Sequence, residues 1–517
     1  NPGKIFEVGT SRCDVRTPQR GVPTTIDNHL RENFTRPLEL PFQPVLAFAF
    51  KDRSFTGNLE QCNGCGGCLK QSGIMCPTFI ATHDEVMSTR GRANIIRAAL
   101  EGRLSRNDPE GFPGRNMTAG KPSLLGDPLK SAELDAALSN CLSCKGCTPE
   151  CPSNVNLALL KAEMLHARWR RDGLPLRERI LSNVDLLGKL GCLLPRLTNQ
   201  LLGSKLARIA MEKAIGISAR RSLPHYASER FDKWFRRHCT ASVSDATNKE
   251  GRSPDRPGGY KPPLLWNRGP VILWDDTFVR YHEPHIGIAA VKVLEALGFE
   301  VALVKHRRCC GRPAFSQGNL DAAAKLAKHN IDLLSSRGAP GGHALPIIFL
   351  EPSCWSMFVE DYRELKIENA ENIAARCFLF EKFVADLLAK EPEALRFKDE
   401  SRSREILIHP HCHAKSILNP AFMATLAERL PGRKATVLDT ACCGMAGAFG
   451  ALAEKYDLSL QVAQRLLDQI DNQPRTLSGS AADTEVIASG TSCRHQISDL
   501  TDKHPTHMAE LLAEAIA

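Results

Sequence analysis

Two short cysteine-rich stretches carry the residues best suited to chemistry in this chain. The first begins at Cys62 and reads CNGCGGCLKQSGIMCP, and the second begins at Cys141 and reads CLSCKGCTPECP. Each has three cysteines separated by two residues, then a fourth cysteine followed by proline. Three thiolates at this spacing converge on one iron–sulfur cluster when the chain between them makes a tight loop. Glycines such as Gly64 and Gly66 lower the steric cost of that loop, so the pattern predicts metal ligation by sulfur.

The cysteine before proline predicts a crossed arrangement of the two ligand sets. In ferredoxins with two [4Fe–4S] clusters, this cysteine ligates the cluster held by the other stretch. The first expected set is Cys62, Cys65, Cys68 and Cys151, and the second is Cys141, Cys144, Cys147 and Cys76. The loop between the third and fourth cysteines is longer in the first stretch than in the second. Two zinc sites are the alternative, although zinc motifs usually present separated CxxC pairs rather than three closely spaced ligands.

Two cysteine doublets, each followed by glycine, lie in the C-terminal half. They are Cys309–Cys310 and Cys442–Cys443. A vicinal disulfide is strained, so a metal site accounts for the adjacent thiols more simply. Near the second doublet, Cys412 and Cys493 stand at the ends of predicted strands and complete four thiolates, enough for a third cluster.

The first doublet has fewer candidate ligands around it. Cys354 adds a third thiol, while Asp276 is placed where Cys412 stands in the second copy. Three interpretations of this site stay open: a cluster with one oxygen ligand, a more labile cluster, or a site that has lost its metal. Several histidines are candidates to ligate metal, to bond a cluster sulfur or to relay protons to an acceptor such as a quinone. They are His282, His285, His409, His411, His413 and His495. The isolated cysteines are interpreted as structural: Cys13, Cys192, Cys239 and Cys377.

Composition narrows the class of protein. The 517 residues are enough for several domains, and 43% hydrophobic and 24% charged residues are ordinary for a soluble globular protein. An odd count of 19 clustered cysteines favours metal ligation in a reducing compartment, which predicts the cytoplasm. Apolar runs stay shorter than the roughly 18–20 residues needed to span a bilayer. The net charge of +9 is scattered, and we interpret the local excess in HARWRRDGLPLRER as a solvated helix face rather than a nucleic-acid site.

Helical patterns predict the elements that position the first two sites. Residues 1–57 are rich in proline, arginine and threonine and are expected to form an extended leader. Residues 58–170 alternate cysteines with helical periodicity, which predicts an all-α, ferredoxin-like two-cluster domain. A helical connector over 171–240 and a polar, glycine- and proline-rich linker over 241–269 follow.

The remainder of the chain predicts two tandem α/β units, 270–400 and 401–517. Each runs strand, helix, strand, Cys-Cys-Gly, long helix and a strand leading to cysteine. Open α/β sheets place their sites at the carboxyl ends of strands, which is where these cysteines fall. The expected fold is therefore multidomain, with an all-α ferredoxin-like domain and two Cys-Cys-Gly units.

The order of the motifs resembles the iron–sulfur part of bacterial FAD-linked D-2-hydroxy-acid dehydrogenases. STRGRANIIRAALEG, RRCCGRPAFSQGNLDAA, LEPSC, DTACCGMAG and SGTSCRHQI follow that order and, with both cysteine stretches, cover about residues 58–517. The chain looks most like the fused enzymes acting on D-2-hydroxyglutarate or D-lactate. It is more distantly similar to iron–sulfur subunits of glycolate oxidase and anaerobic glycerol-3-phosphate dehydrogenase, and to the cysteine-rich subunit of heterodisulfide reductases. The opening NPGKIF resembles the end of a flavin domain, and the family commonly lacks a cysteine where Cys65 stands.

The resemblance implies an oxidoreductase component that works with a flavin. FAD on an upstream domain or partner subunit would take the hydride from the hydroxy acid, and [4Fe–4S] clusters would pass the electrons to a quinone or another carrier. No dinucleotide glycine fingerprint occurs here, so we expect no hydroxy-acid oxidation by this chain alone. The expected location is the cytoplasm, and the alternative is a peripheral position at the inner face of the membrane.

Two competing functions stay open. A heterodisulfide-reductase-like catalytic subunit would use the Cys-Cys-Gly half on a disulfide, although CRHQ after Cys493 lacks the CxxC that such sites use. The second competing function is a non-catalytic scaffold that holds zinc.

Overall fold

Helices form the N-terminal part of the protein. The computed structural model describes residues 38–50, 52–102, 104, 127–247, 268–335, 345–399, 404–471 and 484–517. The cysteine stretches lie among short helices: α2 (Phe55–Glu60), α3 (Pro77–Thr82), η2 (Glu85–Met87), α4 (Thr89–Leu100), α5 (Ala132–Ser139), α6 (Cys147–Glu150) and α7 (Leu157–Asp172). The Ser88 side chain caps α4 by accepting from Gly91 N, and Gly102 (φ 71°) follows the end of the helix in the left-handed conformation that glycine adopts readily.

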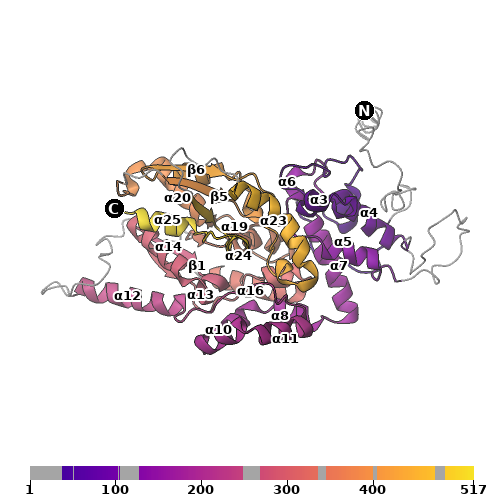
Figure 1. Ribbon diagram of the computed structural model, residues 1–517, viewed down its shortest axis with the longest axis horizontal. Helices are drawn as coiled ribbons and strands as arrows, with labels where there is room; N and C mark the ends of the chain where they lie inside the picture. Colours follow the sequence, from indigo (N-terminus) through magenta and orange to yellow (C-terminus); the bar gives the residue numbers. More distant parts are fainter. Residues whose placement is uncertain are drawn as a thin grey trace, which may run out of the picture.

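The connector is also helical. Its elements are α8 (Leu176–Leu181), α9 (Val184–Gly191), α10 (Pro195–Gly203), α11 (Lys205–Ile215) and α12 (Phe231–Thr247). Figure 1 shows α8, α10 and α11 along one edge of the molecule, below the α/β part. The helix α12 runs into the region predicted as a linker, whose residues 248–267 lie outside the described residues.

Two parallel sheets form the C-terminal part. The first contains β1 (Pro270–Trp274), β2 (Glu300–Leu303), β3 (Ile347–Phe349) and β4 (Cys377–Leu379), in the order β2-β1-β3-β4. The second contains β5 (Arg404–His409), β6 (Arg433–Val437) and β7 (Thr484–Ala488), in the order β6-β5-β7. In both sheets the first strand of the unit lies between the second and the third, which is the shared topology that a tandem repeat predicts.

Helices follow the strands in each unit. The first unit has α13 (Thr277–Tyr281), α14 (Pro284–Ala296), α15 (Arg312–Ser316), α16 (Leu320–Ser335), α17 (Pro352–Ser356), η4 (Met357–Asp361), α18 (Tyr362–Glu364), α19 (Ala370–Ala374), α20 (Phe380–Lys390) and η5 (Pro392–Ala394). The second unit has α21 (Cys412–Lys415), α22 (Ala421–Ala427), η6 (Phe449–Ala451), η7 (Ala453–Lys455), α23 (Tyr456–Asp471), α24 (Thr491–Leu500) and α25 (Met508–Ala515). Among the described residues, none of the helices combines the length and apolar character needed to cross a bilayer.

Shared cores join the parts of the protein. One core contains Ile96 and Leu160 from the cysteine-rich helices together with Trp274 and Phe349 from the first sheet. A second core combines side chains of both α/β units, and in Figure 1 the helix α23 stands next to α3. The cysteine-bearing segments are therefore held in one packed assembly.

The described end of the expected leader is packed rather than extended. Leu46 and Phe48 are buried, and the Glu163 carboxylate accepts from Val45 N and Leu46 N at 2.7 and 2.9 Å. Ala47 N donates to Glu364 O at 2.8 Å, so this segment joins α7 to the first α/β unit. The rest of the predicted leader, residues 1–37 with NPGKIF, lies outside the described residues.

A buried histidine ties the end of the chain to the first unit. His507 caps α25 through Nδ1, which accepts from Ala509 N at 3.0 Å, and its Nε2–H donates to Leu350 O at 3.0 Å. Burial lowers the pKa of His507 to about 3, so the ring is neutral in the folded protein.

Candidate metal centres

The second predicted ligand set meets at one cavity. The lining of this cavity includes Cys76, Cys141, Cys144 and Cys147, with Thr89 and Arg92 beside them. The first of these cysteines comes from the other stretch and precedes α3, so the cavity unites the four residues of the crossed arrangement. Four thiols around one space suit a [4Fe–4S] cluster, and the ligand set stays a prediction that this cavity supports.

Burial makes these thiols costly to ionise without a cation. Burial, and then the neighbouring Cys144 and Cys76, raise the pKa of Cys147 well above its usual value. Burial also raises the pKa of Cys144 to about 12. Only Cys141 is shifted the other way within this set: burial opposes it, but Arg92 and Lys161 lower its pKa. An iron centre would supply the positive charge that stabilises all four thiolates, so the donor set fits a cluster.

The first predicted set lies nearer the surface. Cys65 is exposed, Cys62 is half-buried, and Cys68 and Cys151 are buried. Cys62 interacts electrostatically with both Cys151 and Cys65, which joins the two stretches again. A Cβ added at Gly67 would lie 3.5 Å from Cys65 Sγ and 3.4 Å from a Pro152 ring carbon, so the two loops touch. These contacts support the crossed assignment of Cys151.

Glu150 explains the longer loop of the first stretch. Its carboxylate accepts from Ile74 N at 2.7 Å and from Met75 N at 3.1 Å. A Cβ at Gly73 (φ +86°) would come within 2.6 Å of a Glu150 oxygen, so the loop needs glycine there. The extra residues wrap around a carboxylate of the other stretch, and Cys76 still reaches the second site. This role was not predicted from the sequence, although Glu150 lies inside the second motif.

Two buried cations beside the sites were also missed. The Arg92 guanidinium donates to Ala137 O and Thr78 Oγ1, both at 2.8 Å, and lies 3.7 Å from Cys76 Sγ. Lys145 Nζ lies 2.7 Å from both Glu360 Oε2 and Asp361 Oδ2 in the first α/β unit. Arginine between the motifs (STRGR) and lysine within CLSCKGC were the signals available.

The second doublet joins four thiols in a row. Sulfur contacts link Cys412 to Cys442, Cys442 to Cys443, and Cys443 to Cys493. The contact with Cys442, followed by burial, raises the pKa of Cys412 well above its usual value. Lys415 is a buried cation with electrostatic interactions to Cys412, Cys442 and Cys493, and it was not singled out from the sequence. The four thiols form the compact group that a third cluster would need.

The cysteines that were expected to end strands lie instead in the helices that follow. β5 ends at His409 and β7 ends at Ala488, whereas Cys412 opens α21 and Cys493 lies in the first turn of α24. Cys354 occupies the corresponding turn of α17. Parallel strands lead directly into helices at their carboxyl ends, and the first helical turn has unpaired N–H groups that favour negative charge. The cysteines therefore lie at the predicted edge of each sheet, but in the first turns of the helices and not at the ends of the strands.

His409 is the candidate histidine that the structure brings to these thiols. Its donor atoms and those of Cys443 and Cys493 all lie within 4.8 Å of one another. Nδ1 is 2.7 Å from Thr440 Oγ1, while the buried Nε2 has no hydrogen-bond partner among the described residues. His409 is thus placed to ligate or to bond a cluster sulfur.

The other candidate histidines have protein partners. His411 Nε2 is 3.9 Å from Glu351, and His413 bonds Ser356 Oγ and Ser143 O at 3.2 and 3.1 Å. His282 Nδ1 is 3.0 Å from His225 O, His285 Nε2 is 3.6 Å from Glu510, and His495 interacts electrostatically with Asp499.

The first doublet also gathers its three thiols. Cys354 Sγ and Cys310 Sγ are 3.1 Å apart, and contact with Cys310, followed by burial, raises the pKa of Cys309 well above its usual value. Asp276 interacts electrostatically with Cys354, and its Oδ2 is buried without a hydrogen-bond partner among the described residues. The site offers three sulfurs and one nearby carboxylate.

The predicted equivalence of Asp276 and Cys412 is wrong by one position. Asp276 is the N-cap of α13 and its Oδ1 accepts from Phe278 N at 2.8 Å, whereas the N-cap of α21 is His411. Cys412 is the first helical residue, and its counterpart is Thr277. One carboxylate oxygen of Asp276 is thus engaged in capping, which leaves only the other for a metal.

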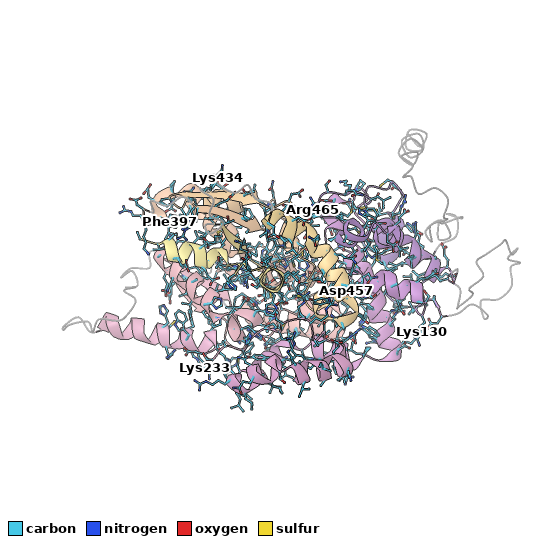
Figure 2. The ribbon with its side chains drawn as sticks, in the orientation of Figure 1. Lys130, Lys233, Phe397, Lys434, Asp457 and Arg465 are labelled. Carbon is cyan, nitrogen blue, oxygen red and sulfur yellow. The ribbon has the colours of Figure 1, made fainter. Side chains whose placement is uncertain are left out.

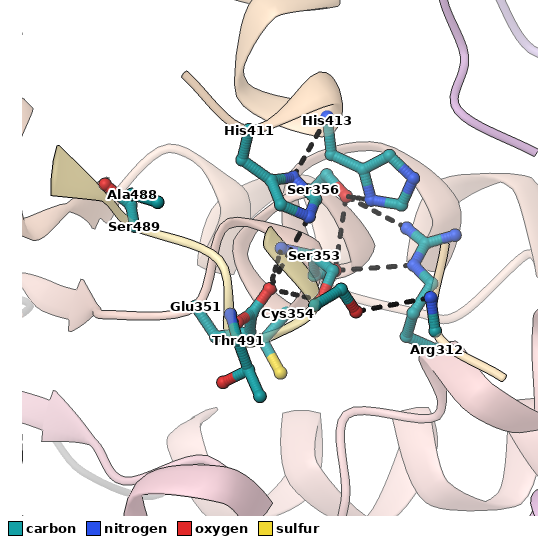
Figure 3. Close-up of polar contacts among 12 residues, drawn as sticks. Arg312, Glu351, Ser353, Cys354, Ser356, His411, His413, Ala488, Ser489 and Thr491 are labelled. Carbon is teal, nitrogen blue, oxygen red and sulfur yellow. Dashed lines mark hydrogen bonds and ion pairs between the residues drawn. The ribbon is translucent and has the colours of Figure 1, made fainter. Parts of the chain in front are cut away.

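A polar network joins the two α/β units between the thiol groups (Figure 3). Glu351 accepts from Thr491 N at 2.8 Å and from Ser353 Oγ at 2.7 Å, and it lies beside His411. Ser356 Oγ accepts from Arg312 at 3.0 Å. The residues at the carboxyl ends of both sheets therefore hold each other in place.

The second ferredoxin-type set adjoins the thiols of the second α/β unit. Cys144 interacts electrostatically with both Cys412 and Cys442. Leu142 belongs to the same apolar core as these two cysteines, and Cys144 packs against it. Thiols that are almost three hundred residues apart in sequence thus form neighbouring sites.

The isolated cysteines have structural surroundings. Cys192 Sγ donates to Tyr281 O at 3.4 Å, and the buried Cys377 Sγ donates to Ile373 O at 3.2 Å. Cys239 is half-buried on α12, while Cys13 lies outside the described residues.

Comparison with known proteins identifies both cysteine-rich parts. Residues 58–155 match the 4Fe-4S dicluster domain, and residues 277–359 and 406–498 match the cysteine-rich domain. The chain is the iron–sulfur part of an oxidoreductase. It is 29% identical over 415 residues to a subunit of the anaerobic glycerol-3-phosphate dehydrogenase of Escherichia coli, covering 80% of this chain and 95% of the relative.

Two further relatives cover different shares of the chain. D-2-hydroxyglutarate dehydrogenase of Pseudomonas putida is 25% identical, and the match covers 88% of this chain but 43% of that protein. Lactate utilization protein A of an Exiguobacterium species is 28% identical over 45% of this chain and 92% of its own length. These matches confirm the resemblance inferred from the motifs.

Proposed function

We propose that this chain is the electron-transfer module of an FAD-linked D-2-hydroxy-acid dehydrogenase acting on D-2-hydroxyglutarate or D-lactate. The observation that carries the proposal is the position of Cys144 beside Cys412 and Cys442. Because the second ferredoxin-type set touches the thiols of the second α/β unit, three candidate cluster sites form one series through the protein. Such a series is what stepwise electron transfer requires.

Each group of residues has one role in this proposal. The two ferredoxin-type sets hold one [4Fe–4S] cluster each, and the second α/β unit holds a third. Bound clusters supply one-electron redox chemistry, while the protein supplies their position and tunes their potential. Arg92 and Lys415 place positive charge beside the thiolates, and a ring nitrogen of His409 lies within 4.8 Å of the sulfurs of Cys443 and Cys493 in the third set.

The partners follow from this division of labour. An FAD-binding domain or subunit delivers electrons at the ferredoxin-type end, and a quinone or another carrier accepts them near the second α/β unit. The first α/β unit, with three thiols and Asp276, is a weaker metal site. We place the dicluster domain at 58–170 and the α/β units at 270–400 and 401–517, in the cytoplasm. The glycerol-3-phosphate dehydrogenase relative makes glycerol-3-phosphate the alternative substrate of the flavin partner.

The cluster count tests the proposal on the full chain purified without oxygen. Iron and acid-labile sulfide, with low-temperature EPR, should give about twelve irons per chain, at roughly four per cluster. Cys144→Ser should remove the signal of one ferredoxin-type cluster, and Cys442→Ser that of the third. Cys377→Ser is the control matched to Cys442→Ser, because Cys377 is buried like Cys442 and lies outside the ligand sets. About eight irons with no effect of Cys442→Ser, or zinc in place of iron, would refute the series.

Substrate choice needs a separate measurement. The flavoprotein partner should reduce the clusters of this chain when D-2-hydroxyglutarate or D-lactate is added under anaerobic conditions, as followed by visible bleaching. Reduction only with glycerol-3-phosphate would favour the alternative substrate and keep the electron-transfer role.

A further inference from the structure

The connector helices α8–α11 expose an unusual amount of apolar surface. Ten of the twelve large apolar side chains that are exposed among the described residues lie between Leu176 and Ile209. Leu193 is 69% exposed, Leu197 61% and Leu206 80%. Leu186 and Leu190 lie four positions apart on α9, and Leu197 and Leu201 lie four apart on α10, so each pair shares one side of its helix, while Leu193 lies between the two helices. We call the exposed apolar side chains of 176–209 the leucine surface, and a patch of this kind marks an interaction site.

Glycines, rather than leucines, face the protein on α9. A Cβ added at Gly188 would lie 2.4 Å from the Tyr281 ring, and one at Gly191 would lie 2.3 Å from the Tyr226 ring. Any larger side chain would push the helix away from these rings. The close packing of the glycine side fixes the rotation of α9, so that Leu190 points outward.

Polar side chains anchor the same helices. Asp185 accepts from Thr277 Oγ1 at 2.9 Å and pairs with the buried Arg307. On α10, Asn199 Nδ2 donates to Tyr226 O at 2.9 Å, and Asn199 Oδ1 accepts from Tyr226 N at 2.8 Å. The protein thus uses the small and polar positions of the connector for packing, and leaves the leucines to solvent.

Within the segment 176–215, the exposed charged side chains have one sign. Arg179, Lys189, Arg196, Lys205 and Lys213 are exposed within 176–215. The acidic residues of this stretch are engaged: Glu178 is buried, Asp185 pairs with Arg307, and Glu212 accepts from Ala219 N. A segment whose exposed leucines alternate along the chain with exposed lysine and arginine is complementary to an anionic apolar surface.

We propose that the leucine surface docks α8–α11 onto a bilayer containing anionic phospholipid, with the leucines in the headgroup–acyl boundary. The cores of protein–protein interfaces are enriched in aromatic residues and depleted of lysine, whereas interfacial membrane helices combine leucine with lysine and arginine, as here. Because the described helices do not span a bilayer, the contact is peripheral. This inference does not depend on the cluster count or on the substrate.

Vesicle flotation tests the docking with the full, iron-loaded chain. The probes are vesicles of phosphatidylcholine alone and of phosphatidylcholine with phosphatidylglycerol. The wild type should float with the anionic vesicles and lose binding as salt is raised. Leu193→Asp and Leu197→Asp should each weaken partition by roughly tenfold or more, because burying a leucine is worth about that factor. Lys189→Glu with Arg196→Glu should weaken it several-fold more on anionic than on neutral vesicles.

Matched controls lie away from the leucine surface. Phe50→Asp changes a side chain that is 66% exposed but lies outside α8–α11, so binding should stay unchanged. Lys434→Glu reverses an exposed charge at the upper edge in Figure 2, opposite α10 and α11 in Figure 1, and should also have no effect. Circular dichroism and the iron content show that each variant folds.

Three results would overturn the proposal. The first is no flotation of the wild type with either vesicle, and the second is equal loss of binding in the control variants. The third is a dimer, seen by light scattering without lipid, that Leu193→Asp dissociates, since the leucine surface would then be a protein interface.

Discussion

Replacing Lys145 with methionine should weaken the contact between the dicluster domain and the first α/β unit. Lys145 lies inside the second cysteine motif, and its side chain is 3% exposed. Its Nζ is 2.7 Å from the carboxylates of Glu360 and Asp361, and the Asp361 side chain is 1% exposed. Burial opposes ionisation of Asp361, but Arg312 and Lys145 lower its pKa, so the Asp361 carboxyl is ionised. Methionine keeps an unbranched chain as far as Cε, with sulfur in place of one methylene, and removes the ammonium group.

The expected loss follows from the carboxylate that remains. Removing one partner of a buried ion pair costs about 3–5 kcal/mol, because the other charge stays buried without compensation. Asp361 also pairs with Arg312, which stays in place, so we expect the lower end, about 3 kcal/mol. The assay is urea unfolding of the iron-loaded protein without oxygen, following the first transition, because a multidomain chain need not unfold in one step.

A surface lysine supplies the comparison. Lys130 is 57% exposed and lies 3.3 Å from Asp172, and it stands at the edge of the molecule in Figure 2. Lys130→Met should cost less than about 1 kcal/mol, as exposed pairs do. Equal small effects of both lysine substitutions would refute the reasoning.

Three further predictions concern the third site and the pH response. His409→Leu should lower iron retention at the third site roughly 10- to 100-fold, as measured by chelator competition, and leave the ferredoxin-type EPR signals unchanged; equal loss of all signals would contradict it. His507 is neutral when folded, with a pKa of about 3, so below about pH 6.5 the unfolded chain binds a proton that the folded chain does not. The stability advantage of the wild type over His507→Gln should therefore shrink as the pH falls below 6.5, approaching about 1.4 kcal/mol per pH unit below about pH 5.5, and a constant difference would exclude this role. Gly444→Ala places a Cβ 2.3 Å from Ser459 O at φ +88° and should cost about 3 kcal/mol of unfolding free energy. Gly447→Ala is the control, because its Cβ would have nothing within 4 Å at φ +63°, and it should cost about 1 kcal/mol. Similar losses in the two variants would show that crowding by Ser459 is not the cause.

Local spacing was sufficient to predict the chemistry of this protein. Tight glycine-rich loops between closely spaced cysteines favour a shared metal, so the sequence predicts the ferredoxin-type sets, and the shared cavity supports the second of them. The repeated strand–helix order around Cys309 and Cys442 likewise predicted two related α/β units, which the shared strand order β2-β1-β3 and β6-β5-β7 bears out. Periodicity also predicted α4 and the strands, because these depend on contacts within a short segment.

Tertiary structure decided everything that depends on which distant residues meet. Glu150 accepts from the long loop, Lys145 reaches Asp361, and His409 lies beside Cys443. These residues meet because of tertiary packing, and no local sequence pattern predicts that they do. The one-position error at Asp276 arose because the helix cap, not the sequence order of motifs, sets the equivalent position. The leucines of α9–α11 have the spacing of a buried face, and only the glycine and polar contacts on the opposite side reveal that they point to solvent. Residue types and spacing determined what chemistry is present, and the packing of helices and sheets determined where it meets.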